Sequence, residues 1–167
     1  WPREFTEETR QLDLDAVLDA LKVESAILLG ISEGGWTAAV YANAHRERIS
    51  YLILLGAYAR GALVPPGFDQ DEDAAILTLM RKGWGRDTPA FRQIFTSRFF
   101  PDSADPALLA HFNELQRVSA DPDTAARYMA SLHTRGDGRE IYTSVRIPTL
   151  VLHARDDQMV TFDEGRL

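Results

Sequence analysis

The sequence of 167 residues contains no cysteine, which excludes disulfide bonds, thiolate nucleophiles and thiolate zinc sites. No hydrophobic run approaches the roughly 18 residues that span a bilayer, and the first residues, Trp1 to Glu4, lack the apolar core of a signal peptide. Positive charge is also scarce, since 18 Lys and Arg residues stand against 25 Asp and Glu residues without a basic cluster that could neutralise phosphates. We therefore expect neither nucleic-acid nor membrane contacts, and the cytoplasm is the favoured location.

The residues that are present predict a globular α/β protein. With 45% hydrophobic and 26% charged residues, the chain can bury a core, and its length indicates one domain. Hydrophobic patterns predict a helix over 6–21, a strand over 25–29, a helix over 36–44, and strands over 49–55 and 149–153. Because helices and strands alternate, the strands should be parallel. This organisation predicts an α/β core over 1–59, a helical cap insertion over 60–142, and a return to the core over 143–167.

The insertion is predicted to be helical throughout. Helical faces are indicated by Phe91, Ile94, Phe95 and Phe99, and by Leu108, Phe112 and Leu115. Ser-Ala-Asp-Pro occurs at 103–106 and again at 119–122, which we interpret as two helix starts with Asp as N-cap and Pro as the first helical residue.

The sequence Gly30-Ile31-Ser32-Glu33-Gly34 has the G-x-S-x-G form of a nucleophile elbow and lies between a predicted strand and a predicted helix. In such a turn Ser32 would be the nucleophile, the N–H of Glu33 would donate to an oxyanion, and Gly30 and Gly34 would supply the room that the tight turn needs. One alternative is a simple tight connection. Another is a degenerate dinucleotide loop, but this fails because serine replaces its second glycine and no acid ends the next strand, Leu54-Leu55-Gly56.

A serine nucleophile needs a base, usually a histidine oriented by a carboxylate. Asp157 follows the third predicted strand, where the acid belongs, and we prefer it to its neighbour Asp156. The four histidines all precede Asp157. We expect His45 to cap the C-terminus of a helix and His153 to pack beside the acid loop. His111 and His133 lie in the predicted insertion, where we expect surface or cap residues. The base is therefore missing from this stretch of sequence.

The alternating aspartates Asp69, Asp71 and Asp73 resemble the start of a calcium-binding loop. The sixth position of that loop is Ala74 instead of Gly and the twelfth is Met80 instead of Glu. We interpret these aspartates as a solvated acidic turn and predict no metal and no other cofactor.

Taken together, these residues resemble the α/β-hydrolase family. The matching stretches are the elbow at 30–35, the end of the second strand at 54–61 and the acid loop at 147–160. The resemblance implies a partial α/β-hydrolase fold in which 24–30, 49–56 and 147–153 are the fifth, sixth and seventh strands and 60–142 is the lid. More narrowly, 56–61 and 156–166 are similar to hydrolase-like domains found in bacteria beside LuxR-type DNA-binding modules or nucleotide cyclase domains.

Two departures from the family pattern stand out. The upstream strands, with the His-Gly loop that gives a second oxyanion donor, have no counterpart, and neither do the last strand and the catalytic histidine. The chain begins with Trp, and its first strand would have an unpaired edge and uncovered faces. We therefore expect a fragment that is inactive by itself.

The resemblance implies a serine hydrolase acting on an ester or related acyl substrate through a Ser-Asp-His triad whose histidine lies outside this chain. Phe91, Phe95, Phe99 and Phe112 of the cap would favour an apolar substrate, although simple packing of the cap is the preferred interpretation. The alternative is a non-catalytic domain that senses a small molecule for a linked regulatory domain, because a fold never guarantees a function.

Overall fold

The computed structural model describes residues 4–61, 70–97, 99–100, 104–132, 135–157 and 159–167. The chain forms two compact units, an α/β unit of residues 2–65 and 132–167 and a helical unit of residues 66–131. The helical unit lies inside the range 60–142 predicted for the insertion.

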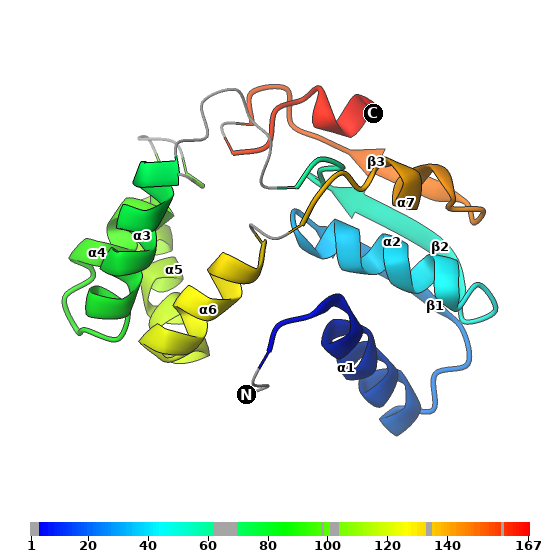
Figure 1. Ribbon diagram of the computed structural model, residues 1–167, viewed down its shortest axis with the longest axis horizontal. Helices are drawn as coiled ribbons and strands as arrows, with labels where there is room; N and C mark the ends of the chain where they lie inside the picture. The colour runs from blue at the N-terminus through cyan, green and yellow to red at the C-terminus, as the bar shows by residue number, and fades with distance from the viewer. Residues whose placement is uncertain (1–3, 62–69, 98, 101–103, 133–134, 158) are drawn as a thin grey trace. The chain divides into compact units, whose positions relative to one another are not determined.

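The α/β unit contains a three-stranded sheet with the order β1-β2-β3 (Figure 1). Its strands are β1 (Ala26–Ile31), β2 (Ile49–Leu55) and β3 (Thr149–Leu152). Both strand pairs are parallel, with Leu28 opposite Leu52 and Leu54 opposite Val151. The predicted α/β class and parallel sheet are confirmed.

Helix α2 (Gly34–Ala44) packs against β1 and β2 and forms the centre of the core of this unit. Three of its four alanines, Ala38, Ala39 and Ala42, are buried, so the helix lies close to the sheet as its composition predicts. Helices α1 (Glu7–Ala20) and α7 (Arg139–Thr143) pack against α2. Helix α7 begins inside the range 60–142 predicted for the cap, yet its residues Ile141 and Tyr142 pack on the core of the α/β unit. A short 3-10 helix, η1 (Glu164–Arg166), follows β3.

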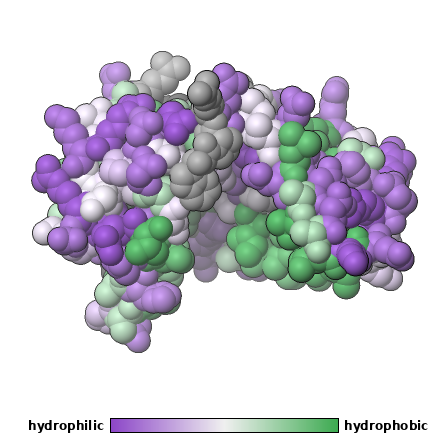
Figure 2. Space-filling model, turned by 90° about the horizontal axis from the view of Figure 1, so that it is seen from below, coloured by the Kyte–Doolittle hydropathy of each residue, from purple (hydrophilic) through white to green (hydrophobic). Residues whose placement is uncertain are grey.

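The other face of the sheet is exposed. In a parallel sheet, paired residues point to the same side, and the side away from α2 carries large hydrophobic residues between 39% and 62% exposed: Ile27, Leu29, Ile31, Tyr51, Leu55, Leu150 and Leu152. Figure 2 shows hydrophobic residues gathered at the surface over the α/β unit, on the right of the view. Within the described residues, β1 and β3 each pair with β2 alone, so the unpaired edge predicted for the first strand is present. The expectation that both faces of this strand are uncovered is wrong, because α2 packs against one of them.

Tyr41 is a buried core residue of α2 whose hydroxyl donates to Asp15 Oδ1 at 2.6 Å. Burial, together with this hydrogen bond, raises the pKa of Tyr41 to about 12. The unfolded chain releases this proton near pH 10, whereas the folded chain retains it. The free energy of unfolding is therefore expected to fall as the pH rises from 10 towards 12. Urea unfolding across this range should show a shallower fall for Tyr41→Phe, and an unchanged slope in that variant would contradict the assignment.

The helical unit consists of α3 (Gln70–Gly83), α4 (Ala90–Thr96), α5 (Pro106–Ser119) and α6 (Pro122–Leu132). Its core is formed by Met80, Trp84, Ala125 and Ala126. The two predicted helix starts are confirmed, because Asp105 accepts from the Ala107 N–H at 2.8 Å and Asp121 Oδ1 accepts from the Thr124 N–H at 2.9 Å. Asp71 lies in the first turn of α3 rather than in an acidic turn, and Asp69 lies outside the described residues.

The predicted apolar face of α5 is wrong in part. Leu108 and Leu115 are about half exposed, whereas the polar side chains of Asn113 and Gln116 are buried. The buried polar groups are stabilised by hydrogen bonds, since Thr96 Oγ1 donates to Asn113 Oδ1 at 2.7 Å and Gln116 Nε2 donates to Thr96 Oγ1 at 2.7 Å. Hydrophobic spacing carries no information about such a network.

The aromatic residues of this unit contact one another. The ring of Phe95 lies 4.9 Å from that of Phe99, which in turn lies 5.9 Å from that of Phe112. The rings of Phe95 and buried Trp84 also form a T-shaped contact, with their centroids 5.7 Å apart. These contacts favour the packing interpretation for Phe95, Phe99 and Phe112 over a role in substrate binding.

Arg92 is the largest fully buried residue of the helical unit, with 1% exposure. It donates to the carbonyl oxygens of Asn113 at 2.9 Å and Arg86 at 2.6 Å, and also to that of Trp84. Burial lowers the pKa of the Arg92 guanidinium, yet these carbonyls replace its hydration. Arg92 therefore ties the chain after α3 to the middle of α5.

We expect Arg92→Met to lower the free energy of unfolding by roughly 3 kcal/mol, because it leaves buried carbonyl groups without a donor. The matched control is Arg117→Met, which breaks an exposed pair with Glu114 and should cost less than about 1 kcal/mol. Urea unfolding measures both variants, and equal effects would contradict the importance of the buried network.

Candidate active site

The turn between β1 and α2 holds Ser32 in a left-handed backbone conformation with φ 50°. Only two non-glycine residues in the described part of the chain have positive φ, the other being Lys22. This conformation costs about 1–3 kcal/mol and persists only where neighbouring structure fixes it. Here the Ser32 N–H donates to the Leu55 carbonyl oxygen at 2.8 Å, and the Ser32 carbonyl oxygen accepts from the Gly35 N–H at 3.0 Å. The strand, the strained serine and the helix thus have the arrangement expected of a nucleophile elbow.

Glycine is required at two positions around this turn. A side chain at Gly30 would lie 2.6 Å from Gly35 Cα, and one at Gly35 would lie 2.4 Å from Ala57 Cβ. A side chain at Gly34 would meet nothing within 4 Å. The expectation that Gly34 supplies room therefore needs correction, since α2 approaches the sheet and the Ala57 loop through Gly35.

We expect Gly35→Ala to lower the free energy of unfolding by about 1–3 kcal/mol, because the added methyl group overlaps Ala57. Gly34→Ala provides the matched control in the adjacent residue and should be neutral or slightly stabilising, since alanine is favoured in helices. Urea unfolding distinguishes them, and equal stability of the two variants would contradict this packing.

Glu33 is the N-cap residue of α2, so its N–H lies where a helix has N–H groups without helical partners. This is the position from which we expect an oxyanion donor. The Glu33 carboxylate lies near two arginines, with Oε1 at 3.1 Å from Arg135 Nη2 and 3.5 Å from Arg10 Nε.

Asp157 lies in the loop that follows β3. Its Oδ1 accepts from the N–H groups of Met159 and Val160, both at 2.9 Å. Its Oδ2 lies towards Gly56, where a side chain would come within 3.6 Å of it. One oxygen therefore shapes the loop, while the other lies over the end of β2. Asp157 is 25% exposed, whereas Asp156 is more exposed.

The structure places Ser32 and Asp157 at the same end of the sheet, where the carboxyl ends of the strands lie. Ser32 follows β1 and Asp157 follows β3, and both strands are parallel to β2, which lies between them. The Gly56 N–H donates to the Leu152 carbonyl oxygen at 2.9 Å, which fixes the end of β2 beside the start of the acid loop. In parallel sheets, ligand sites form at the carboxyl ends of the strands.

Of the histidines, His153 is buried beside the acid loop. Its Nε2 donates to the Val160 carbonyl oxygen at 2.9 Å and lies 3.8 Å from Asp157 Oδ2. His45 is the C-cap residue of α2 and stacks on Tyr41 at 4.3 Å. His111 is exposed on α5, and His133 lies outside the described residues. The three described histidines therefore occupy the structural positions expected from the sequence.

Two charged residues whose side chains are buried near this end of the sheet, Arg135 and Glu164, were not predicted as site residues from the sequence. Glu164 Oε2 accepts from the N–H groups of Ala59 at 3.1 Å and Arg60 at 3.3 Å, and Oε1 accepts from Arg60 Nε at 2.7 Å. It thereby fixes the loop that follows β2. No motif surrounds Glu164, so its burial could not be predicted from the sequence.

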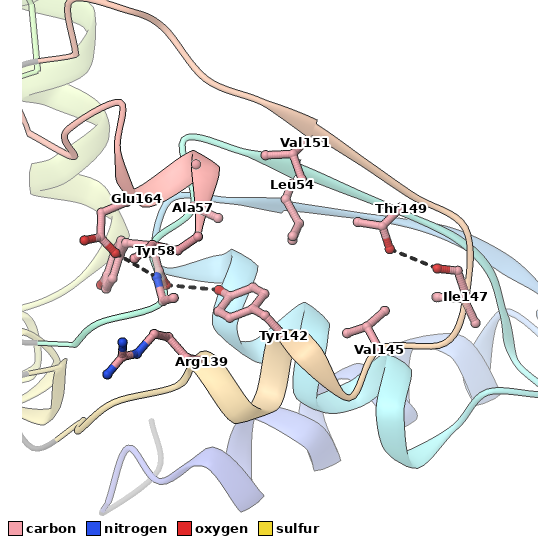
Figure 3. Close-up of a pocket in the computed structure, with 13 residues that line it drawn as sticks. Leu54, Ala57, Tyr58, Arg139, Tyr142, Val145, Ile147, Thr149, Val151 and Glu164 are labelled. Carbon is pink, nitrogen blue, oxygen red and sulfur yellow. Dashed lines mark hydrogen bonds between the residues drawn. The ribbon is translucent and has the colours of Figure 1, made fainter.

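A pocket of about 290 Å³ lies beside β3, between α7 and η1. It is lined largely by apolar residues, including Leu54, Val145 and Val151, with Tyr142 at one side (Figure 3). Burial raises the pKa of Tyr142 well above its usual value, and its hydroxyl donates to the Tyr58 carbonyl oxygen at 3.1 Å. The residues that line this pocket do not include Ser32 or Asp157. It is therefore distinct from the candidate site.

The described part of the chain contains no cluster of three or more side chains suited to a metal ion. Among the helices in that part of the chain, none combines the length and the hydrophobicity needed to cross a bilayer.

Comparison with known proteins adds independent evidence. The family model described as alpha/beta hydrolase fold matches residues 2–165. Over 93% of its length, the chain is 29% identical to the AB hydrolase superfamily protein YisY of Bacillus subtilis. It is 28% identical, over 91% of its length, to a 2-hydroxy-6-oxononadienedioate/2-hydroxy-6-oxononatrienedioate hydrolase of Paraburkholderia phymatum. An esterase structure from Exiguobacterium antarcticum superposes with a TM-score of 0.78 and 26% identity over 96% of the chain.

These similar proteins are longer. The chain covers 58% of the Bacillus protein, 53% of the Paraburkholderia hydrolase and 59% of the Exiguobacterium esterase. The family match nevertheless spans nearly all of the 167 residues, including the turn at Ser32 and the loop at Asp157. The chain belongs to the α/β-hydrolase family.

Proposed function

We propose that the protein is a serine hydrolase that acts on an ester or a related acyl substrate. The observation that carries the proposal is the strained backbone of Ser32, with φ 50°, in a tight turn between a parallel strand and a helix. Strain of this kind is concentrated at functional sites. The esterase from Exiguobacterium antarcticum, at 26% identity, supports ester chemistry.

In the proposed reaction Ser32 Oγ attacks the acyl carbon of the substrate while a histidine takes the serine proton. The Glu33 N–H stabilises the oxyanion that forms, and Asp157 orients the histidine. The leaving alcohol then receives the proton, and water hydrolyses the acyl-serine to regenerate Ser32 and release the acid.

The histidine of this triad would come from outside the 167 residues. Two observations support this part of the proposal. His153 already donates from Nε2 to Val160, and the similar hydrolases and the esterase are longer than this chain. The proposal also includes a small-molecule substrate, no cofactor and a cytoplasmic location. The isolated 167 residues would then be inactive.

The test is hydrolysis of p-nitrophenyl esters with acyl chains of increasing length by the full-length gene product. We expect turnover, with an initial burst of p-nitrophenol equal to the enzyme concentration if deacylation limits the rate with the best ester. A folded full-length product that hydrolyses none of these esters would overturn the proposal. Ligand binding without turnover would instead favour the small-molecule sensor.

A further inference from the structure

Arg135 contacts the residue that follows Ser32 at both its backbone and its side chain. Arg135 Nη1 donates to the Glu33 carbonyl oxygen at 3.3 Å, and Nη2 lies 3.1 Å from Glu33 Oε1. The side chain of Arg135 is only 7% exposed. Ion pairs that are shielded from water in this way are stronger than exposed ones, provided that both charges are compensated.

The surroundings compensate these charges and limit the movement of the guanidinium. Arg135 Nη2 also lies 3.0 Å from Glu7 Oε2 in α1, and Arg10 lies 3.5 Å from Glu33. The Arg135 guanidinium lies over the Trp36 ring, 5.3 Å from its centroid. Among the described residues, the cluster therefore contains two cations and two anions, and it fixes the first turn of α2 to the start of α1.

The backbone beside Arg135 is anchored as well. Residues 59–61 and 136–138 both belong to the α/β unit and form a short antiparallel stem around the bridge between Arg60 and Asp137. In this stem the Gly61 N–H donates to the Gly136 carbonyl oxygen at 2.9 Å, and the Gly138 N–H donates to that of Ala59 at 2.7 Å. Glu164 fixes the first strand of the stem from the other side. The backbone that directly follows Arg135 is therefore held in place by hydrogen bonds.

A strained turn persists only where its surroundings determine its conformation. We propose that Arg135 is a positioning residue, which acts through Glu33 to hold Ser32 and the Glu33 N–H in the geometry that acyl transfer requires. The inference rests on the proposed function of Ser32. Arginine suits this role because its planar guanidinium can contact a carbonyl oxygen and a carboxylate together, which a lysine ammonium does less well.

The test is the rate at which a fluorophosphonate probe modifies Ser32 in the full-length gene product. We expect Arg135→Met to slow labelling roughly 10- to 100-fold, because small displacements of reacting groups have effects of this size. Glu33→Gln should slow labelling less, since it retains the carbonyl contact. Arg135→Lys should recover part of the rate. The matched control is Arg146→Met, at an exposed arginine that donates to carbonyl groups of its own turn.

The double variant Arg135→Met/Glu33→Gln separates positioning from general stabilisation. If Arg135 acts through Glu33, the double variant should label no more slowly than Arg135→Met alone. Additive effects, or labelling of Arg135→Met at the wild-type rate, would overturn the inference while leaving Ser32 reactive. Thermal unfolding identifies any variant that fails to fold. If Arg135→Met is one of them, the labelling rates of the single variants Arg135→Lys and Glu33→Gln decide whether the inference holds. Absence of labelling in the folded wild-type protein would instead overturn the proposed function, and the inference with it.

Discussion

Ser32→Ala is expected to reduce ester hydrolysis by the full-length gene product by about 10⁴- to 10⁶-fold, which is the cost of removing a serine nucleophile from a triad. The loss should appear in kcat, with little change in KM, because the hydroxyl acts in the transition state more than in substrate binding. Removing the side chain should not disturb the fold, since the turn is fixed by hydrogen bonds of the Ser32 backbone to Leu55 and Gly35. Steady-state kinetics with the best p-nitrophenyl ester measures the effect.

Ser50→Ala is the matched control for this experiment. Ser50 is exposed and lies near the start of β2, at the end of the sheet opposite to Ser32. Its hydroxyl donates to the Ala26 carbonyl oxygen at 3.1 Å, so the control also removes a serine hydrogen bond. Normal turnover by folded Ser32→Ala would mean that the chemistry takes place elsewhere.

Asp157→Asn is expected to reduce kcat by about 10⁴-fold, the effect of replacing the acid of a serine triad by its amide. An amide at this position can still accept hydrogen bonds, so the loop contacts of Oδ1 with Met159 and Val160 should survive. Because the amide oxygen stays at the Oδ1 position, the NH2 group would take the Oδ2 position and present a donor to the histidine, which favours the wrong tautomer. A pH–rate profile of the variant tests whether the loss involves the base.

Asp156→Asn provides the control from the adjacent residue, and it also tests the choice between the two aspartates. Asp156 is the more exposed of the pair, and we expect its substitution to change kcat by less than about threefold, as for a surface charge outside the reacting groups. An equal or larger loss in Asp156→Asn would exchange the proposed roles of the two residues.

The layout of the α/β unit followed from local patterns in the sequence. The strand at 49–55 was predicted with the bounds that the structure has, and the other two strands differ from their predicted ranges by one or two residues at their ends. Continuous hydrophobic runs are typical of the strands of a parallel sheet. The alternation of these runs with helices along the chain indicated that the strands are parallel. The N-caps at Asp105 and Asp121 were predictable because capping depends on residues within one turn of the helix.

Features that depend on distant parts of the chain could not be predicted in this way. The G-x-S-x-G spacing pointed to Gly34, but the close contact at Gly35 is with Ala57, which follows the next strand. Arg135 and Glu164 are charged residues without a recognisable motif, and their burial depends on partners about 100 residues away in the sequence. Hydrophobic spacing likewise favoured Leu108 and Leu115 over the buried polar residues of α5.

The candidate site shows the same division. Ser32 and Asp157 were identified because each follows a predicted strand, and a parallel sheet brings the ends of its strands to one edge. The contacts that fix their geometry come from the loop at 56–61, from the stem and from α1, which the sequence does not connect to the site. The positions of Ser32 and Asp157 were therefore predictable from the sequence, whereas the contacts that hold them in place were not.

The central claim is that Ser32 is a covalent nucleophile. The most direct measurement is peptide mass spectrometry of the full-length gene product after reaction with a fluorophosphonate probe. The account predicts a single adduct, located on Ser32 and absent when the protein is unfolded before the probe is added. An adduct at a different residue, or no adduct on the folded protein, would contradict it.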